Sequence, residues 1–195
     1  KAASADGMIT VGAQGTAHGN IAVNNKKLLE KGLRGIIDEI DEKINNFVPK
    51  DIEGTGKLTF WKAAKISCEA VIAFAHRDSE YAADLASKTE DEKRKEELLE
   101  ISRILKKVPE HPAETFREAL QSVWLIYAVT QIEADPHAML LGRFDQYMYP
   151  YYKKDIENGT LTEEQTVELL SMIWIKCTAI IKLMDSVTTR TFAGF

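Results

Sequence analysis

The chain has 195 residues, 45% of them hydrophobic, which is enough for one folded domain or a large part of one. Its net charge is −5 and its basic and acidic residues are interspersed, so it lacks the basic face that nucleic-acid binding needs. The longest apolar run, Val123–Val129, is far shorter than the roughly 20 residues that span a bilayer. We therefore expect no nucleic-acid partner and no membrane span.

The cysteines and the chain ends suggest a compartment and a context. Cys68 and Cys177 lie in apolar helical patterns, which favours reduced thiols in a cytoplasmic protein. The first residues contain no apolar core of a secretory signal. The chain begins at Lys1 without a methionine and stops at T-F-A-G-F without a helix cap, which suggests a segment of a longer polypeptide.

Helical spacing of apolar residues dominates after a glycine-rich start. Residues 1–24 predict loops with a short strand. The pattern then predicts four helices, the last of them buried, over residues 25–47, 59–87, 90–108 and 114–133. Residues 49–56, with the sequence P-K-D-I-E-G-T-G, predict a connector between the first two. The chain is expected to be mostly helical, with a few short strands.

The last third predicts a corner and a final helix. The stretch G-R-F-D-Q-Y-M-Y-P places Phe144 and Tyr147 on an inward face, and Pro150 is expected to bend the chain away. We expect the polar residues Arg143, Asp145 and Gln146 to anchor the preceding loop by hydrogen bonds. Gly159 suits a helix C-cap, and Thr162 with Gln165 forms a capping box that starts the last helix.

Several apparent sites have ordinary explanations. The sequence G-T-G-K at Gly54–Lys57 lacks the spacing and the hydroxyl residue of a phosphate-binding loop, and is interpreted as part of the connector. His76 and Glu80 form an i, i+4 pair, which is more often a solvated pair than a metal site. The three tryptophans lie in apolar stripes and are expected in the core: Trp61, Trp124 and Trp174.

Two loops are the candidates for a binding site. The first, Gly15–Asn25, holds His18 and Asn20 among glycines, which suits a backbone that approaches a ligand closely. The second, Glu133–Arg143, contains His137 and an apolar run that begins at Met139. Such a run is costly to expose, so we expect this loop to turn toward a core or a pocket. For His137 alone, structural and functional interpretations remain equally open.

Motifs along almost the whole chain resemble the glycyl radical enzymes. They are G-N-I-A-V-N-N-K-K-L-L-E-K-G-L-R-G-I, C-E-A-V-I-A-F-A-H-R, V-P-E-H-P-A-E-T-F-R-E-A-L-Q-S-V-W, Q-I-E-A-D-P-H-A-M-L-L-G-R-F-D-Q-Y-M-Y-P-Y-Y and the final F-A-G-F. The chain is most similar to the glycerol/diol dehydratase and choline lyase branch, rather than to pyruvate formate-lyase itself. The resemblance implies an α/β fold, in which residues 1–195 are a mainly helical part of one ten-stranded α/β barrel domain.

The resemblance also implies a radical mechanism. In this family a separate radical-SAM activating enzyme converts a glycine to a radical, which oxidises a cysteine to a thiyl that removes hydrogen from a small substrate. No other cofactor and no metal is implied, and the protein is expected to be an anaerobic homodimer. The catalytic cysteine motif G-C-x-E and the radical glycine motif R-V-x-G-[Y/F] are expected downstream, so no residue of this span is assigned a catalytic role. The segment alone is expected to be inactive.

Two departures from the family pattern point to the substrate. Diol-dehydrating relatives read G-H-S where this chain has Pro136, His137 and Ala138, and F-x-x-G-Y where it ends at Phe195. The two lost hydroxyls would leave a polyol with unpaired groups, at about 1 to 3 kcal/mol each. One interpretation is a more apolar substrate, such as an arylacetate that is decarboxylated. The alternative is that residues outside this segment replace the two hydroxyls. The expected substrate-pocket residues are His18, Asn20, His137, Ala138, Met139 and Phe195.

Two other readings stay open at this stage. One is a helical scaffold or interaction module that uses the same framework without chemistry. The other is a small helical protein that binds an apolar ligand between its helices. A downstream cysteine loop and glycine loop in the same gene would favour the lyase over the scaffold. Cooperative unfolding of these 195 residues alone, as a stable monomer, would favour the small helical protein.

Overall fold

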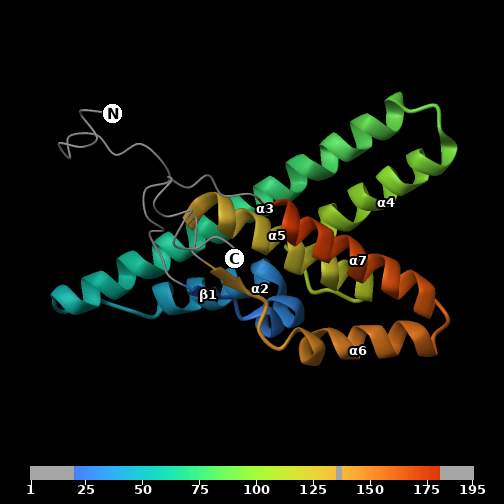
Figure 1. Cartoon of the computed structure of the whole chain (residues 1–195). Helices are drawn as coiled ribbons and strands as arrows, with labels where there is room; N and C mark the ends of the chain where they lie inside the picture. Colours follow the sequence, from blue (N-terminus) through green and yellow to red (C-terminus); the bar gives the residue numbers. More distant parts are fainter. Residues whose placement is uncertain (1–19, 135–137, 181–195) are drawn as a thin grey trace, which may run out of the picture.

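A computed structural model describes residues 20–134 and 138–180 of the chain, which are mainly helical (Figure 1). In chain order the elements are β1 (Asn20–Ala22), α2 (Asn25–Asn45), α3 (Ile52–Lys88), α4 (Glu92–Lys107), α5 (Phe116–Ala134), β2 (Ala138–Leu140), α6 (Phe144–Glu157) and α7 (Glu163–Ala179). Within those two ranges, none of the helices combines the length and apolar character needed to cross a bilayer. The expectation of a mostly helical chain with a few short strands is confirmed for these residues.

Several helices begin where a side-chain oxygen accepts a hydrogen bond from a backbone N–H. Thr162 and Gln165 form the expected capping box at the start of α7. Asp51 accepts from the N–H of Gly54 at 2.6 Å, so α3 begins at Ile52. The prediction that residues 49–56 form a connector is therefore wrong for residues 52–56, which belong to α3. The cap at Asp51 starts the helix in spite of the two glycines that follow.

The buried helix α5 lies at the centre of the molecule, as its apolar sequence predicted. Its side chains reach three apolar clusters, and the largest also includes residues of α2, α4, α6 and α7. The buried members of that cluster are Leu29, Ile104, Val108, Ala113, Phe116, Ala119, Leu120, Val123, Met148 and Ile173. The tryptophan prediction holds only in part. Trp124 packs against this cluster and Trp61 is half-buried against Phe47, whereas Trp174 is 48% exposed.

Helix α2 is kinked at Gly32, where a single helix was predicted. Gly32 has a φ of 65°, and the connector between α4 and α5 passes close to it. The N–H of Leu33 donates to the carbonyl of Pro109 at 2.8 Å, and the N–H of Arg34 donates to the carbonyl of Glu110 at 2.9 Å. The kink thus redirects two backbone N–H groups from α2 to the connector. The periodicity of the apolar residues is unchanged, so the sequence pattern did not reveal it.

Helix α6 continues through Pro150, so the expectation that this proline bends the chain away is wrong. Proline removes one backbone hydrogen bond from the helix interior. Met148 on one side of Pro150 and Asp155 on the other are both buried, which holds the helix in place across it. The helix ends at Glu157, and Gly159 with a φ of 69° follows it as predicted.

Candidate functional site

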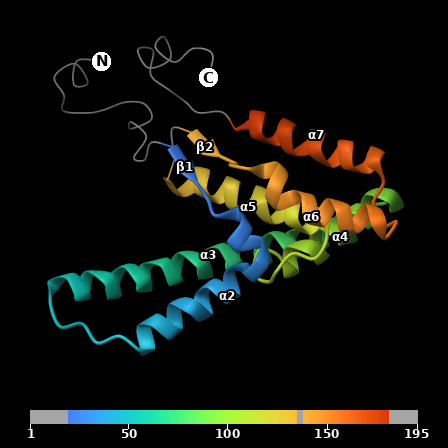
Figure 2. The same ribbon diagram turned by 90° about the horizontal axis from the view of Figure 1, so that it is seen from below.

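The two loops that the sequence singled out meet in a parallel strand pair. Strands β1 and β2 pair in the register Asn20 with Ala138, Ile21 with Met139 and Ala22 with Leu140. Figure 2 shows the strands side by side, with α2 continuing from β1 and α6 following β2. Segments far apart in sequence therefore bring three of the candidate pocket residues together: Asn20, Ala138 and Met139.

The remaining candidate residues cannot be placed in this way. His18, His137 and Phe195 lie outside the described residues, so their part in a pocket stays a prediction. Within the strand pair, Asn20 is exposed and Met139 is half-buried. The described part of the candidate site therefore combines one exposed polar residue with one half-buried apolar residue.

The apolar run that ends the second loop divides between two environments. Leu141 packs against the largest apolar cluster, as expected for a loop that turns inward. Leu140 is 48% exposed, so the prediction fails for this residue. Successive side chains of a strand point to opposite faces, so the half-buried Met139 and the exposed Leu140 of β2 differ although the apolar run is continuous.

The polar anchor of this loop is Tyr147, not the residues expected from the motif. Arg143 and Asp145 form an ion pair at 2.9 Å, but their side chains are 71% and 68% exposed. Such a pair contributes little to stability. The hydroxyl of Tyr147 instead donates to the carbonyl of Leu141 at 2.8 Å and accepts from Nδ2 of Asn25 at 3.1 Å. Burial raises the pKa of Tyr147 to about 12, although the hydrogen bond from Asn25 opposes that shift.

Several known proteins contain a segment similar to this chain. The chain matches the family described as pyruvate formate lyase-like over residues 1–195. An isethionate sulfite-lyase from Nitratidesulfovibrio vulgaris is 37% identical over 169 residues, which are 86% of this chain and 20% of that protein. The glycerol-bound structure of a B12-independent glycerol dehydratase from Clostridium butyricum has 39% identity and a TM-score of 0.83, and the match covers 90% of this chain and 22% of that one. A structure from work on 1,2-propanediol dehydration in Roseburia inulinivorans has 43% identity and a TM-score of 0.78, over 82% of this chain and 20% of that one.

The chain belongs to the glycyl radical enzymes of the pyruvate formate lyase-like family. This confirms the resemblance that its motifs indicated. The chain spans about a fifth of the length of the relatives it matches. The part of the family fold described for this chain is its six helices and the β1–β2 pair.

The two cysteines of this glycyl radical enzyme segment are not poised as nucleophiles. Cys68 on α3 and Cys177 on α7 are free, half-buried thiols. Burial raises the pKa of both, and the nearby Glu69 adds to the rise at Cys68. A raised pKa disfavours the thiolate at neutral pH.

His76 has a different partner from the one expected. Its Nε2 lies 2.8 Å from Oε2 of Glu110 on the α4–α5 connector, rather than pairing with Glu80. The two atoms are close enough for an ion pair, but they are not aligned for a hydrogen bond. Among the described residues, no group of three potential ligands is placed to hold a metal ion.

Asp155 is a structural residue that sequence reasoning missed. It is 6% exposed, and its Oδ2 accepts from the N–H of Phe116 at 2.7 Å, at the start of α5. A carboxylate at a helix start satisfies an N–H that has no partner within the helix and interacts favourably with the helix dipole. In K-K-D-I-E it resembles a surface charge, but it lies seven positions after the buried Met148, on the same helix face.

Replacing Asp155 by alanine is expected to weaken the start of α5. The N–H of Phe116 would lose its partner, at a cost of about 1 to 2 kcal/mol. Amide hydrogen exchange in the complete protein should speed up roughly 10-fold at the first turn of α5. Asp145→Ala is the control, because that carboxylate is exposed on the same helix. Equal exchange in the two variants would contradict the assigned role of Asp155.

Proposed function

We propose that the complete protein is a glycyl radical lyase that cleaves a C–O, C–N or C–C bond of a small substrate. The observation that carries the proposal is the parallel pairing of β1 with β2, in a chain of this family. The pairing brings Asn20 to the same register as Ala138, so one polar side chain and the residue that departs from the diol pattern are neighbours. In this proposal β1 and β2 are two strands of the ten-stranded α/β barrel.

The task of this segment is to hold the substrate rather than to generate the radical. A glycyl radical, installed by a separate radical-SAM activating enzyme, would supply the hydrogen-atom chemistry in the complete protein. Asn20 offers an amide that can donate to and accept from a substrate. His18 and His137, immediately upstream of the described strands, are proposed to contribute further polar groups. The complete protein is proposed to act as a cytoplasmic homodimer.

The proposed substrate has a larger apolar part than glycerol. Ala138 and Phe195 stand where diol-dehydrating relatives have hydroxyl side chains, so two hydrogen-bond partners of a polyol are missing. An arylacetate that is decarboxylated fits such a pocket, with Phe195 packed against its ring. The half-buried Met139 adds a flexible apolar side chain to the same strand pair.

Anaerobic activation of the complete protein tests the proposal directly. The purified protein would be treated with its activating enzyme and examined by electron paramagnetic resonance for a glycyl radical. It would then be assayed with indole-3-acetate, isethionate, glycerol and 1,2-propanediol. We expect a radical signal and turnover of the arylacetate. Absence of a radical would refute the lyase, and efficient dehydration of either diol would refute the apolar substrate.

Restoring the hydroxyl at position 138 is expected to favour polyols. Ala138→Ser should raise kcat/KM for glycerol and 1,2-propanediol by roughly 5- to 100-fold, because one hydrogen bond to a substrate hydroxyl is regained at about 1 to 3 kcal/mol. Steady-state rates of the activated protein measure this. The control is Ala22→Ser, at the other end of the same strand pair. An equal gain in both variants would show that a hydroxyl at position 138 has no specific effect.

A further inference from the structure

We propose that Asn25 and Tyr147 are positioning residues that fix the register of β1 against β2, and through it the place of the substrate. The inference rests on the proposed function, because it takes the β1–β2 pair as part of the substrate site. The pair needs such support. Each strand has only three residues, and an isolated two-stranded sheet is marginally stable at best.

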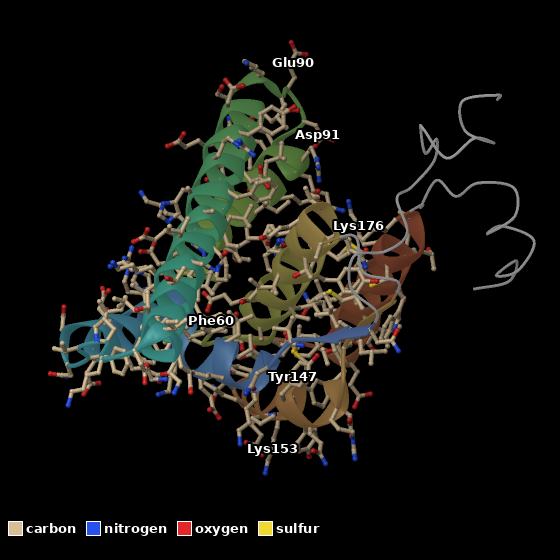
Figure 3. The ribbon with its side chains drawn as sticks, turned by 90° about the vertical axis from the view of Figure 1, so that its left-hand side faces the viewer. Phe60, Glu90, Asp91, Tyr147, Lys153 and Lys176 are labelled. Atoms are coloured by element: carbon tan, nitrogen blue, oxygen red, sulfur yellow. The ribbon has the colours of Figure 1, made fainter. Side chains whose placement is uncertain are left out.

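The two residues connect the points where the chain leaves the strands. Asn25 is the first residue of α2, and its N–H donates to the carbonyl of Val23, directly after β1, at 2.9 Å. Leu141 directly follows β2, and its carbonyl accepts from the hydroxyl of Tyr147. The Asn25 amide donates to that same hydroxyl, so the phenol joins the two exits through one oxygen. Figure 3 shows Tyr147 on α6, on the side of that helix next to α2.

The surroundings make this connection rigid. Asn25 is only 4% exposed, so little water can compete for the hydrogen bond of its side chain. The ring of Tyr147 meets that of Phe144 edge to face, with centroids 5.7 Å apart. Gly142, with a φ of 65°, turns the chain between β2 and α6, and its carbonyl accepts from the N–H of Phe144 at 2.9 Å. The phenol is therefore held by packing as well as by its two hydrogen bonds.

A change in strand register would move the candidate pocket residues. A slip of one residue transfers every side chain of a strand to its other face. Even a smaller tilt displaces Asn20 relative to Ala138, and a misplacement of about 1 Å can cost a reaction roughly 100-fold in rate. The hydrogen bonds lie at the carboxyl ends of the strands, whereas Asn20 and Ala138 lie at the amino ends. Asn25 and Tyr147 thus act through the strands and not by contact with the substrate.

The test uses Tyr147→Phe, Asn25→Ala and the double variant in the complete protein. Tyr149→Phe is the matched control, because it removes the same hydroxyl from the same helix at a residue that is 58% exposed. Hydrogen exchange before activation should speed up roughly 10-fold at residues 20–23 and 138–141 in Tyr147→Phe, with α7 unchanged. The double variant should exchange no faster than Tyr147→Phe, because both changes remove one connection. Unchanged exchange in Tyr147→Phe would overturn the proposal.

Kinetics separate positioning from stability. With the most rapidly converted of the four test compounds, Tyr147→Phe should lower kcat about 10-fold or more and change KM less than about threefold. The glycyl radical yield, measured by electron paramagnetic resonance, should match that of the wild type. Faster strand exchange with an unchanged kcat would overturn the positioning role. A wild-type protein that forms no radical would refute the proposed function instead. Hydrogen exchange alone would then test whether Asn25 and Tyr147 hold the two strands together.

Discussion

Gly32→Ala is expected to destabilise the packing of α2 against the α4–α5 connector by about 3 kcal/mol. Gly32 has a φ of 65°, which side chains other than glycine adopt only with strain. A β-carbon there would also overlap the backbone of Glu110 and His111. Both must shift, and the hydrogen bonds from Leu33 and Arg34 to that connector would be lost with them. Amide hydrogen exchange of α2 in the complete protein should speed up on the order of 100-fold.

Gly56→Ala is the matched control for this substitution. Gly56 lies within α3, and a β-carbon there would meet nothing within 4 Å beyond the adjacent backbone of its own helix. Alanine is favoured over glycine in a helix interior by about 0.5 to 1 kcal/mol, so this variant should be slightly more stable than the wild type. If Gly32→Ala were as stable as Gly56→Ala, the close approach at the kink would not be a constraint.

The kink illustrates which parts of the fold the sequence could predict. Helix positions follow from the spacing of apolar residues, and the capping box at Thr162 follows from two residue types at a fixed separation. The kink at Gly32 and the continuation of α6 through Pro150 depend on packing against segments far away in the sequence. Local helix preferences therefore predict where the helices lie, but they do not predict where tertiary contacts override those preferences.

The same division applies to the candidate site. The glycines around Asn20 and the apolar run after Ala138 marked two unusual loops, and the structure pairs the strands that contain them. The hydrogen bonds of Tyr147 were not predictable, because its motif offered more polar neighbours in Arg143 and Asp145. Exposure decided between them, and exposure depends on the position of α2 relative to α6. A tyrosine on the inward face of a helix is the one signal that could have suggested it.

Glu118→Ala is expected to destabilise the start of α5 by about 2 to 3 kcal/mol, since it removes a buried carboxylate that accepts several hydrogen bonds. The Glu118 side chain is 2% exposed, and its Oε2 accepts from Nζ of Lys107 at 2.9 Å. The N–H of Glu114 donates to the same carboxylate at 2.9 Å, and Arg103 Nη1 lies 3.4 Å from it. Without the carboxylate, these donors lose a shared acceptor. Hydrogen exchange of α5 in the complete protein measures the loss.

Glu114→Ala is the control for that result, because Glu114 also pairs with Lys107, at 2.7 Å, but its side chain is 71% exposed. Exposed pairs contribute about 0 to 1 kcal/mol, so this variant should be close to the wild type. Equal effects of the two substitutions would contradict the dependence on burial.

The stabilisation by Glu118 is also expected to depend on pH. Burial tends to raise the pKa of Glu118, but its hydrogen bonds with Lys107 and the N–H of Glu114 outweigh burial and hold it below the ordinary 4.5. A carboxyl whose folded pKa is lowered stabilises the fold above its unfolded pKa, and the contribution is lost as pH falls through the folded pKa. The stability difference between the wild type and Glu118→Gln should therefore be constant near neutral pH and shrink below about pH 4.5. A difference that stayed constant into that acidic range would show that Glu118 acts through its shape and not through its charge.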